Sequence, residues 1–266
     1  MTTATDRILT YLKRIGLKNR PAPTVKNLFI LQRQHLLHVP YEDIDIWRGQ
    51  AGALSFDELF DKIVLRRRGG YCFELNGLFG WLLRELGYET EEHFGRWLMG
   101  ESLEIPARRH RIVRVKINGT AYVADVGVGQ RAPLTPLELV QDRIQTREGV
   151  DYRIVRHGRL GNVVEVRVGG AWSRMYSFDD AVQEPIDFNY VHYYCANHPA
   201  SFFRNNLLVH LPTLTGRKSI GSFPDPETGE SVPVLSIGGA KGTTRTFLRT
   251  PASFASALRR HFGIIA

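Results

Sequence analysis

Cys72 has the residue type and sequence position best suited to covalent chemistry. It follows two glycines in the segment Arg-Gly-Gly-Tyr-Cys-Phe-Glu, residues 68–74. Apolar residues then recur at spacings of three and four up to Leu86, before Gly87, which predicts an amphipathic helix that begins near the cysteine. The positive end of a helix stabilises a thiolate, so we expect the pKa of Cys72 to fall below its ordinary value of ~8.5. The alternative is a buried cysteine that serves only as a small apolar side chain.

A hairpin further along the chain carries a candidate base and its orienting group. Residues 110–117 and 120–126 alternate apolar and polar side chains, and Asn-Gly joins them, which is a strong hairpin signal. The two-residue turn places Asp125 opposite Ile112 and His110 opposite Gly127. His110 and Asp125 then share one face as diagonal neighbours, with Cα atoms ~7–8 Å apart.

A thiol, an imidazole and a carboxylate are the nucleophile, base and orienting group of covalent catalysis. Spacing alone does not show that Cys72 meets His110. The alternative is that His110 and Asp125 make only local hydrogen bonds at the ends of their strands.

These motifs resemble those of the arylamine N-acetyltransferase family. The resemblance rests on residues 68–76, on His110 ahead of an apolar strand, and on Tyr-Val-Ala-Asp-Val-Gly at residues 122–127. It extends to residues 35–42, the proline pair within 133–137, and, more weakly, to 197–203 and 262–264. The resemblance implies that Cys72, His110 and Asp125 form a catalytic triad.

The resemblance also implies a reaction. An acetyl group would pass from acetyl-coenzyme A to Cys72 and then to an aromatic amine or hydrazine, in a two-step (ping-pong) exchange. Backbone N–H groups near Cys72 and in residues 127–129 are expected to stabilise the oxyanion. Each aromatic candidate for the pocket wall has simple core packing as its alternative. The candidate binding residues are Tyr41, Tyr71, Phe73, Gly127, Val128, Gly129 and Phe203.

Two positions depart from the family pattern. Val128 stands where the family usually carries Phe, which removes an aromatic wall from the predicted pocket. The family's Pro-Phe-Glu-Asn is Pro-Tyr-Glu-Asp here, so Tyr41 and Asp43 add a phenol and an acid. These departures leave the preferred acceptor open.

Three other functions remain open at this point. An amide synthase that closes a macrolactam from a carrier-bound acyl chain would use the same triad. A thiol hydrolase or transglutaminase-like enzyme would resolve the thioester with water or a protein amine. A non-catalytic binding module would explain the basic charge, but not why cysteine, histidine and aspartate occur together.

The fold class implied by the resemblance is α+β: an N-terminal helical bundle, a β-barrel and a C-terminal α/β lid. The corresponding domains are residues 1–90, 91–195 and 196–266, with the triad between the first two. Periodicity predicts helices up to Gly16, over 24–37, and after the capping box of Ser55 and Glu58. Strand alternation dominates residues 88–177, an irregular connection is expected over 178–200, and strands and a terminal helix follow.

The charge of the chain indicates which kinds of partner to expect. The chain has 266 residues, a net charge of +8 and a pI of about 9.6, but its basic residues are scattered rather than clustered. We expect the runs 66–68 and 108–109 to form a positive rim for the phosphates of coenzyme A; the alternative is a solvated face. Nucleic acid is not expected as a partner.

Other sequence features indicate a cytoplasmic protein. No apolar run has the ~18–20 residues of a membrane span, and no secretory signal is expected at the N-terminus. Two cysteines, one of them assigned to catalysis, make a disulfide framework implausible. The nine histidines are dispersed, so no metal site is expected. The sequence leaves oligomeric state open.

Overall fold

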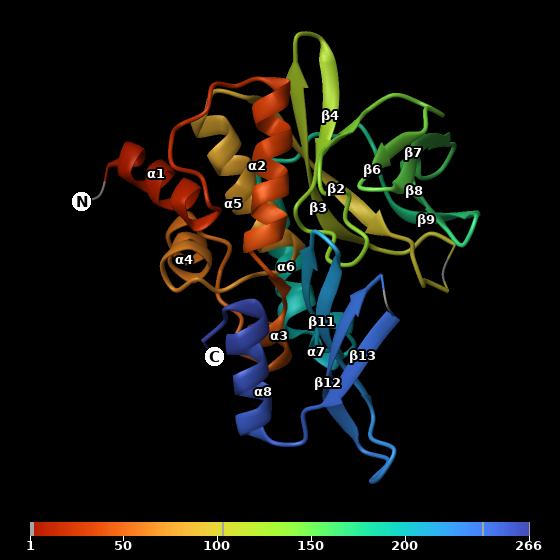
Figure 1. The fold of residues 1–266 in the computed structure, drawn as a ribbon. Helices are drawn as coiled ribbons and strands as arrows, with labels where there is room; N and C mark the ends of the chain where they lie inside the picture. Colours follow the sequence, from red (N-terminus) through yellow and green to blue (C-terminus); the bar gives the residue numbers. More distant parts are fainter. Residues whose placement is uncertain (1–2, 103, 241, 266) are drawn as a thin grey trace.

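The computed structural model describes residues 3–102, 104–240 and 242–265. Helices from the first part of the chain pack against a large curved sheet, and a second, smaller sheet lies below both (Figure 1). The triad candidates come from the first two of these parts, while the second sheet closes one side of the site.

The N-terminal helices begin at capping side chains and share one apolar core. Thr3, Thr24 and Ser55 each accept a hydrogen bond from the backbone N–H three residues later. The caps at Thr24 and Ser55 confirm the predicted starts of the second and third helices. Gly87, with a φ of 91°, follows the cysteine helix as predicted. The helices are α1 Ala4–Arg14, α2 Val25–His38, α3 Ile44–Trp47, α4 Phe56–Phe60 with the π-helical turn Asp61–Leu65, and α5 Cys72–Glu85.

The large sheet is a nearly closed barrel of eight antiparallel strands, in the order β5-β4-β3-β2-β9-β8-β7-β6. The side chain of Gln145 on β6 bridges to the backbone of Glu138 on β5 through two hydrogen bonds of 2.8 Å. This side chain joins the two edge strands of the sheet. The strands are β2 Glu89–Trp97, β3 Arg108–Ile117, β4 Thr120–Ala124, β5 Leu137–Glu138, β6 Gln145–Arg147, β7 Val150–His157, β8 Gly161–Val168 and β9 Ala171–Phe178.

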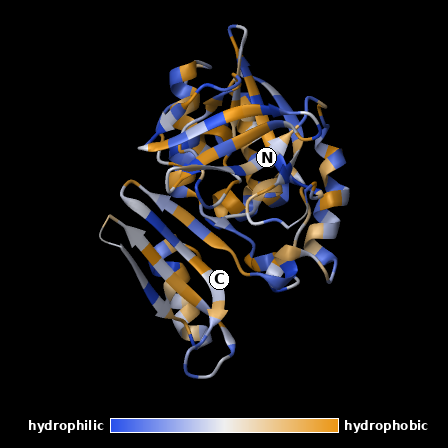
Figure 2. Cartoon of the chain, turned by 90° about the vertical axis from the view of Figure 1, so that its right-hand side faces the viewer, coloured by the Kyte–Doolittle hydropathy of each residue, from blue (hydrophilic) through white to orange (hydrophobic). Residues whose placement is uncertain are grey.

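The smaller sheet has five antiparallel strands, and its first strand comes from the N-terminal part of the chain. Its apolar face is covered by α8 Pro251–Ala257 and the π-helical turn Leu258–Phe262 (Figure 1). Hydrophobic and hydrophilic residues are mixed along its strands (Figure 2), and they alternate strictly over 209–212 and 231–234, as expected where one face of a sheet is covered. The strands are β1 Tyr41–Glu42, β10 Val209–Thr213, β11 Gly216–Pro224, β12 Ser231–Gly239 and β13 Gly242–Phe247.

Residues 188–197 form helix α6, so the prediction of an irregular connection is wrong over this range. The helix buries Phe188, His192 and Cys195, which share one face, and exposes the tyrosines between them. Because both faces are aromatic, the helical period is not visible in the sequence. The short helix α7, Phe202–Asn205, follows, and a 3₁₀ turn, Pro185–Asp187, precedes α6.

The predicted fold class is confirmed: helices, a barrel-like sheet, and a C-terminal sheet with its helix. The domain limits stay a prediction, and β1 shows that the smaller sheet is not formed by residues 196–266 alone. Within the described residues, no helix combines the length and the apolar character needed to cross a membrane.

Candidate active site

Two glycines allow the backbone ahead of Cys72 to pass directly against residues 40–42. A Cβ atom on Gly69 would lie 2.0 Å from the carbonyl oxygen of Pro40, so no larger residue fits. The N–H of Gly70 donates to that carbonyl at 3.3 Å, and the carbonyl of Gly70 accepts from the N–H of Glu42 at 2.8 Å. The start of α5 is therefore fixed to the segment that carries Tyr41.

Buried ion pairs fix the same segment. Arg68 Nε donates to Glu42 Oε1 at 3.0 Å, and Glu42 is fully buried. Glu74 accepts from the N–H of Tyr71 at 3.0 Å and from Lys62 at 2.8 Å. Arg68 is therefore a buried ion-pair partner of Glu42 that stabilises the fold. The prediction that it lies in a positive rim is wrong.

His110 and Asp125 are in direct contact, as the hairpin predicted. Nε2 of His110 lies 2.6 Å from Oδ2 of Asp125, and both residues are buried. The other carboxylate oxygen accepts from Asn76 Nδ2 at 2.7 Å and from the N–H of Gly127 at 2.8 Å. Because the carboxylate occupies Nε2, the imidazole keeps Nδ1 as its basic nitrogen.

The hairpin register is confirmed up to the pair Val113 and Ala124, where β4 ends. Asp125 lies one residue beyond that strand, and the residue that faces His110 across the ladder is Gly95 of β2. Gly127 instead packs on the nucleophile: a Cβ atom there would lie 2.7 Å from Cys72 Cα. The loop after β4 thus brings the carboxylate and the cysteine together.

Cys72 is the first residue of α5, but its thiol is buried. Its Sγ donates to the carbonyl oxygen of Arg109 at 3.6 Å. Burial, with the neighbouring Cys195, raises the pKa of the Cys72 thiol well above its ordinary value, although the N–H groups of Arg111 and Phe73 act in the opposite direction. The predicted lowering is therefore wrong for the thiol taken alone, because its removal from water outweighs the N–H groups that favour the thiolate.

Cys72 and His110 line one cavity of about 360 Å³. Of the candidate wall residues, Tyr41, Gly127, Val128 and Phe203 also line it. Further residues complete the wall, and apart from Arg109 of the predicted rim none of them was a candidate. They come from the end of β2 and the loop after it, β3, the loop after β4, α7, and β10 with the residue before it, so most lie far in sequence from Cys72 and give no local signal. These are Trp97, Met99, Gly100, Glu101, Arg109, Gln130, Phe202, Leu208 and His210.

Tyr71 and Phe73 lie in the core behind the cavity, with no exposed surface. The hydroxyl of Tyr71 contacts His192 Nδ1 at 2.5 Å, and Phe73 packs against Phe188 with ring centroids 5.8 Å apart. Tyr71 and Phe73 are therefore core-packing residues, which was the alternative to their predicted place in the pocket wall.

A family model described as N-acetyltransferase matches residues 24–264. The arylamine N-acetyltransferase of Mycolicibacterium smegmatis is 36% identical over 215 residues, 79% of this chain and 78% of that protein. The chain belongs to the arylamine N-acetyltransferase family. It is accordingly an acetyltransferase.

Solved structures of the family have the same fold. A variant of the M. smegmatis N-arylamine acetyltransferase superposes with a TM-score of 0.86 at 32% identity, covering 97% of this chain and 92% of that one. The Mycobacterium marinum arylamine N-acetyltransferase in complex with CoA gives a TM-score of 0.85 at 30% identity, with the same shares of each chain.

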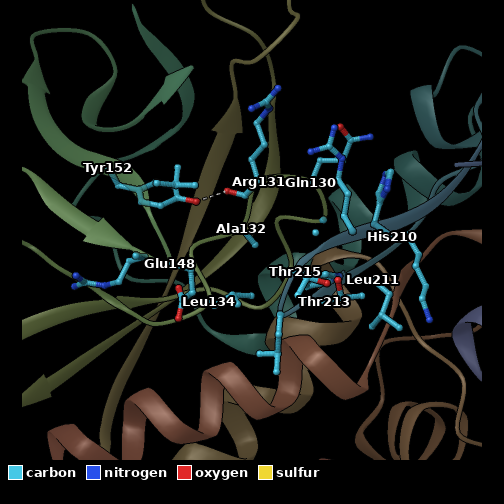
Figure 3. A pocket seen from close by; sticks show the side chains of 18 residues that line it. Gln130, Arg131, Ala132, Leu134, Glu148, Tyr152, His210, Leu211, Thr213 and Thr215 are labelled. Atoms are coloured by element: carbon cyan, nitrogen blue, oxygen red, sulfur yellow. Dashed lines mark hydrogen bonds between the residues drawn. The ribbon is translucent and has the colours of Figure 1, made fainter. Parts of the chain in front are cut away.

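A second cavity of about 420 Å³ adjoins the first in this acetyltransferase, and both are lined by Gln130 and His210. Gly129, predicted to line the substrate pocket, lies on this second cavity. Figure 3 shows its side chains coming from the barrel, with Glu148 and Tyr152, and from the smaller sheet, with His210 and Leu211. Its basic side chains are Arg131, Arg147, Arg217 and Lys218.

The predicted basic rim is largely neutralised. Arg108 pairs with Asp179, and Arg109, on the wall of the first cavity, pairs with Glu101. The second cavity is therefore better suited to an anionic group. In the part of the chain that the structure describes, no group of three or more His, Cys, Asp or Glu side chains is arranged to hold a metal ion.

Proposed function

We propose that this acetyltransferase carries acetyl groups from acetyl-coenzyme A to aromatic amines and hydrazines through acetyl-Cys72. The observation that supports the proposal most strongly is that Cys72 and His110 line one cavity while Asp125 holds the imidazole at 2.6 Å. Nucleophile, base and orienting group are then Cys72, His110 and Asp125.

In the first half-reaction, Nδ1 of His110 takes the proton of Cys72 as sulfur attacks the carbonyl carbon of the thioester. A new C–S bond forms and the carbonyl electrons move to oxygen. When that oxyanion collapses, the bond to the sulfur of coenzyme A breaks, and His110 returns the proton to the leaving thiolate. Burial alone disfavours the thiolate of Cys72, but transfer of its proton to His110 provides that thiolate.

In the second half-reaction, the amine enters the same cavity after coenzyme A leaves. Its nitrogen attacks the carbonyl carbon of acetyl-Cys72, and His110 removes the nitrogen's proton. The bond to Cys72 sulfur then breaks, and the proton passes back to the thiolate. Asp125 stabilises the imidazolium that forms in each half-reaction.

The second cavity is the proposed place for the phosphates of the donor. It adjoins the cavity of Cys72 through Gln130 and His210 and carries four basic side chains against one acid, Glu148. Glu148 already pairs with Arg33 at 2.6 Å, so the local charge balance stays positive. Guanidinium and ammonium groups bind phosphate oxygens through charge-assisted hydrogen bonds.

Steady-state kinetics with both substrates varied tests the two-step scheme. Double-reciprocal plots against acetyl-coenzyme A at several arylamine concentrations should give parallel lines, because the donor product leaves before the acceptor binds. Release of coenzyme A without amine should amount to one equivalent per active site. Intersecting lines, with no release of coenzyme A until amine is added, would contradict the covalent scheme.

A further inference from the structure

The oxyanion of each half-reaction needs hydrogen-bond donors, and two N–H groups of the loop after β4 already have partners. The N–H of Gly127 donates to Asp125 at 2.8 Å. The N–H of Val126 donates to Asn76 Oδ1 at 2.9 Å. Of the donors expected near Cys72, Gly127 is thus already committed to holding the carboxylate of the triad.

Tyr41 brings a hydroxyl to the same cavity. Its side chain lines the cavity with Cys72 and His110 and is 9% exposed. The hydroxyl makes no hydrogen bond to any other residue that the structure describes. It also keeps some accessible surface, whereas the hydroxyl of Tyr176 is fully buried without a partner. The phenol of Tyr41 is therefore open to a ligand in the cavity.

The backbone and ring of Tyr41 are held from three sides. Tyr41 pairs with Gly70, two residues before the nucleophile, and with His210 of β10. A Cβ atom on Gly129 would lie 3.4 Å from Tyr41 Cγ, so the loop also packs on the ring. These contacts fix the phenol relative to Cys72 without help from a ligand, as a preorganised donor requires.

The phenol is held in its donor form. Burial, followed by the charge of a Cys72 thiolate, raises the pKa of Tyr41 well above its ordinary value. A phenol that stays protonated can donate to a negative oxygen over the whole working range of pH.

We propose that Tyr41 is a further catalytic residue, whose hydroxyl donates a hydrogen bond to the acyl carbonyl oxygen as negative charge develops on it. The inference rests on the proposed function, since the oxyanion arises only if Cys72 attacks an acyl thioester. The hydrogen bond shortens as the C–S bond to Cys72 forms and weakens again when the bond to the leaving sulfur breaks. The phenol keeps its proton throughout.

The variant Tyr41→Phe removes the hydroxyl and keeps the ring. Two reactions of Cys72 are compared in this variant and in the wild type. One is its acetylation by acetyl-coenzyme A, with the rate measured by rapid quench and intact-mass spectrometry, and the other is its alkylation by iodoacetamide. Alkylation needs the thiolate but forms no oxyanion. We expect acetylation to slow by ~10²-fold, the usual effect of losing one oxyanion donor, and alkylation to stay unchanged.

Tyr88→Phe is the matched control, because it removes a buried hydroxyl bonded to the carbonyl of Thr24 at 3.0 Å, remote from the cavity lining. It should change neither rate. Equal slowing of both rates in Tyr41→Phe would assign Tyr41 to the thiol or the fold and overturn the inference, as would unchanged acetylation. A wild-type enzyme that is never acetylated would instead overturn the proposed function itself.

Discussion

At the residue scale, Cys72 lies at a helix N-terminus, which lowers the pKa of a thiol, and in the protein interior, which raises it. Burial raises the pKa of its thiol, so at neutral pH the thiol alone is protonated. Its reactivity must then come from a partner that takes the proton. His110 lines the same cavity and, with Asp125 on Nε2, keeps its other nitrogen for that purpose.

Replacing His110 with Gln should therefore move the alkylation of Cys72 to alkaline pH. Each unit by which the thiol pKa exceeds the pH lowers the thiolate fraction about tenfold, so alkylation near neutral pH should slow by at least ~10-fold. Rates from pH 6 to 10, with alkylation sites identified by peptide mass mapping, measure this shift. Cys195 is an internal control, because its pKa is raised to about 12. Identical profiles for both proteins would exclude His110 as the proton acceptor.

At the scale of elements, the site depends on how closely the loop after β4 packs on α5. Gly127 is required by that approach: an added Cβ would meet Cys72 Cα at 2.7 Å and Asn76 Nδ2 at 2.8 Å. Asn76 in turn donates to Asp125 and to the carbonyl of Arg111, next to His110. Helix, strand and loop thus position the three catalytic candidates together.

Gly127→Ala should reduce acetyl transfer by ~10²-fold, because a misplacement of the order of 1 Å in a catalytic group has that effect. Gly158→Ala is the matched control, since nothing lies within 4 Å of its added Cβ. Transfer rates should be measured together with thermal unfolding, and the control should match the wild type in both. Full activity in Gly127→Ala would show that the loop does not contact the nucleophile as described.

At the scale of the whole molecule, the smaller sheet completes a site that the helices and barrel begin. It contributes His210 to both cavities and holds Tyr41 through the pairing of β1 with β10. The second cavity, between the barrel and this sheet, adds Arg217 and Lys218 from β11. Donor binding is therefore expected to depend on groups far in sequence from Cys72.

Arg217→Ala should raise the Michaelis constant for acetyl-coenzyme A by about tenfold, as expected for losing a charged hydrogen bond to phosphate of ~1.5 kcal/mol. The constant for acetyl-pantetheine, which has no phosphate, should not change. Arg159→Ala, a surface arginine outside the second cavity, is the matched control. Equal effects of Arg217→Ala on both donors would place the phosphates elsewhere.

Local signals account for what the sequence predicted correctly. The helix of Cys72 and the hairpin of His110 and Asp125 follow from periodicity and from the Asn-Gly turn, which act over a few residues. The pairing of Tyr41 with His210 joins segments far apart in the chain, and so does the pairing of β2 with β9 that places Trp97 on the cavity wall. Burial of the thiol arises only when all parts pack, so its effect on the pKa had no local signal.

The proposed two-step transfer depends on an acetyl group that is carried by Cys72. Intact-mass spectrometry of the protein mixed with acetyl-coenzyme A and no amine tests it most directly, with Cys72→Ala alongside. We expect a single acetyl increment in the wild type, none in the variant, and loss of the increment when an arylamine or hydrazine is added. No increment, or an increment that persists in Cys72→Ala, would contradict it.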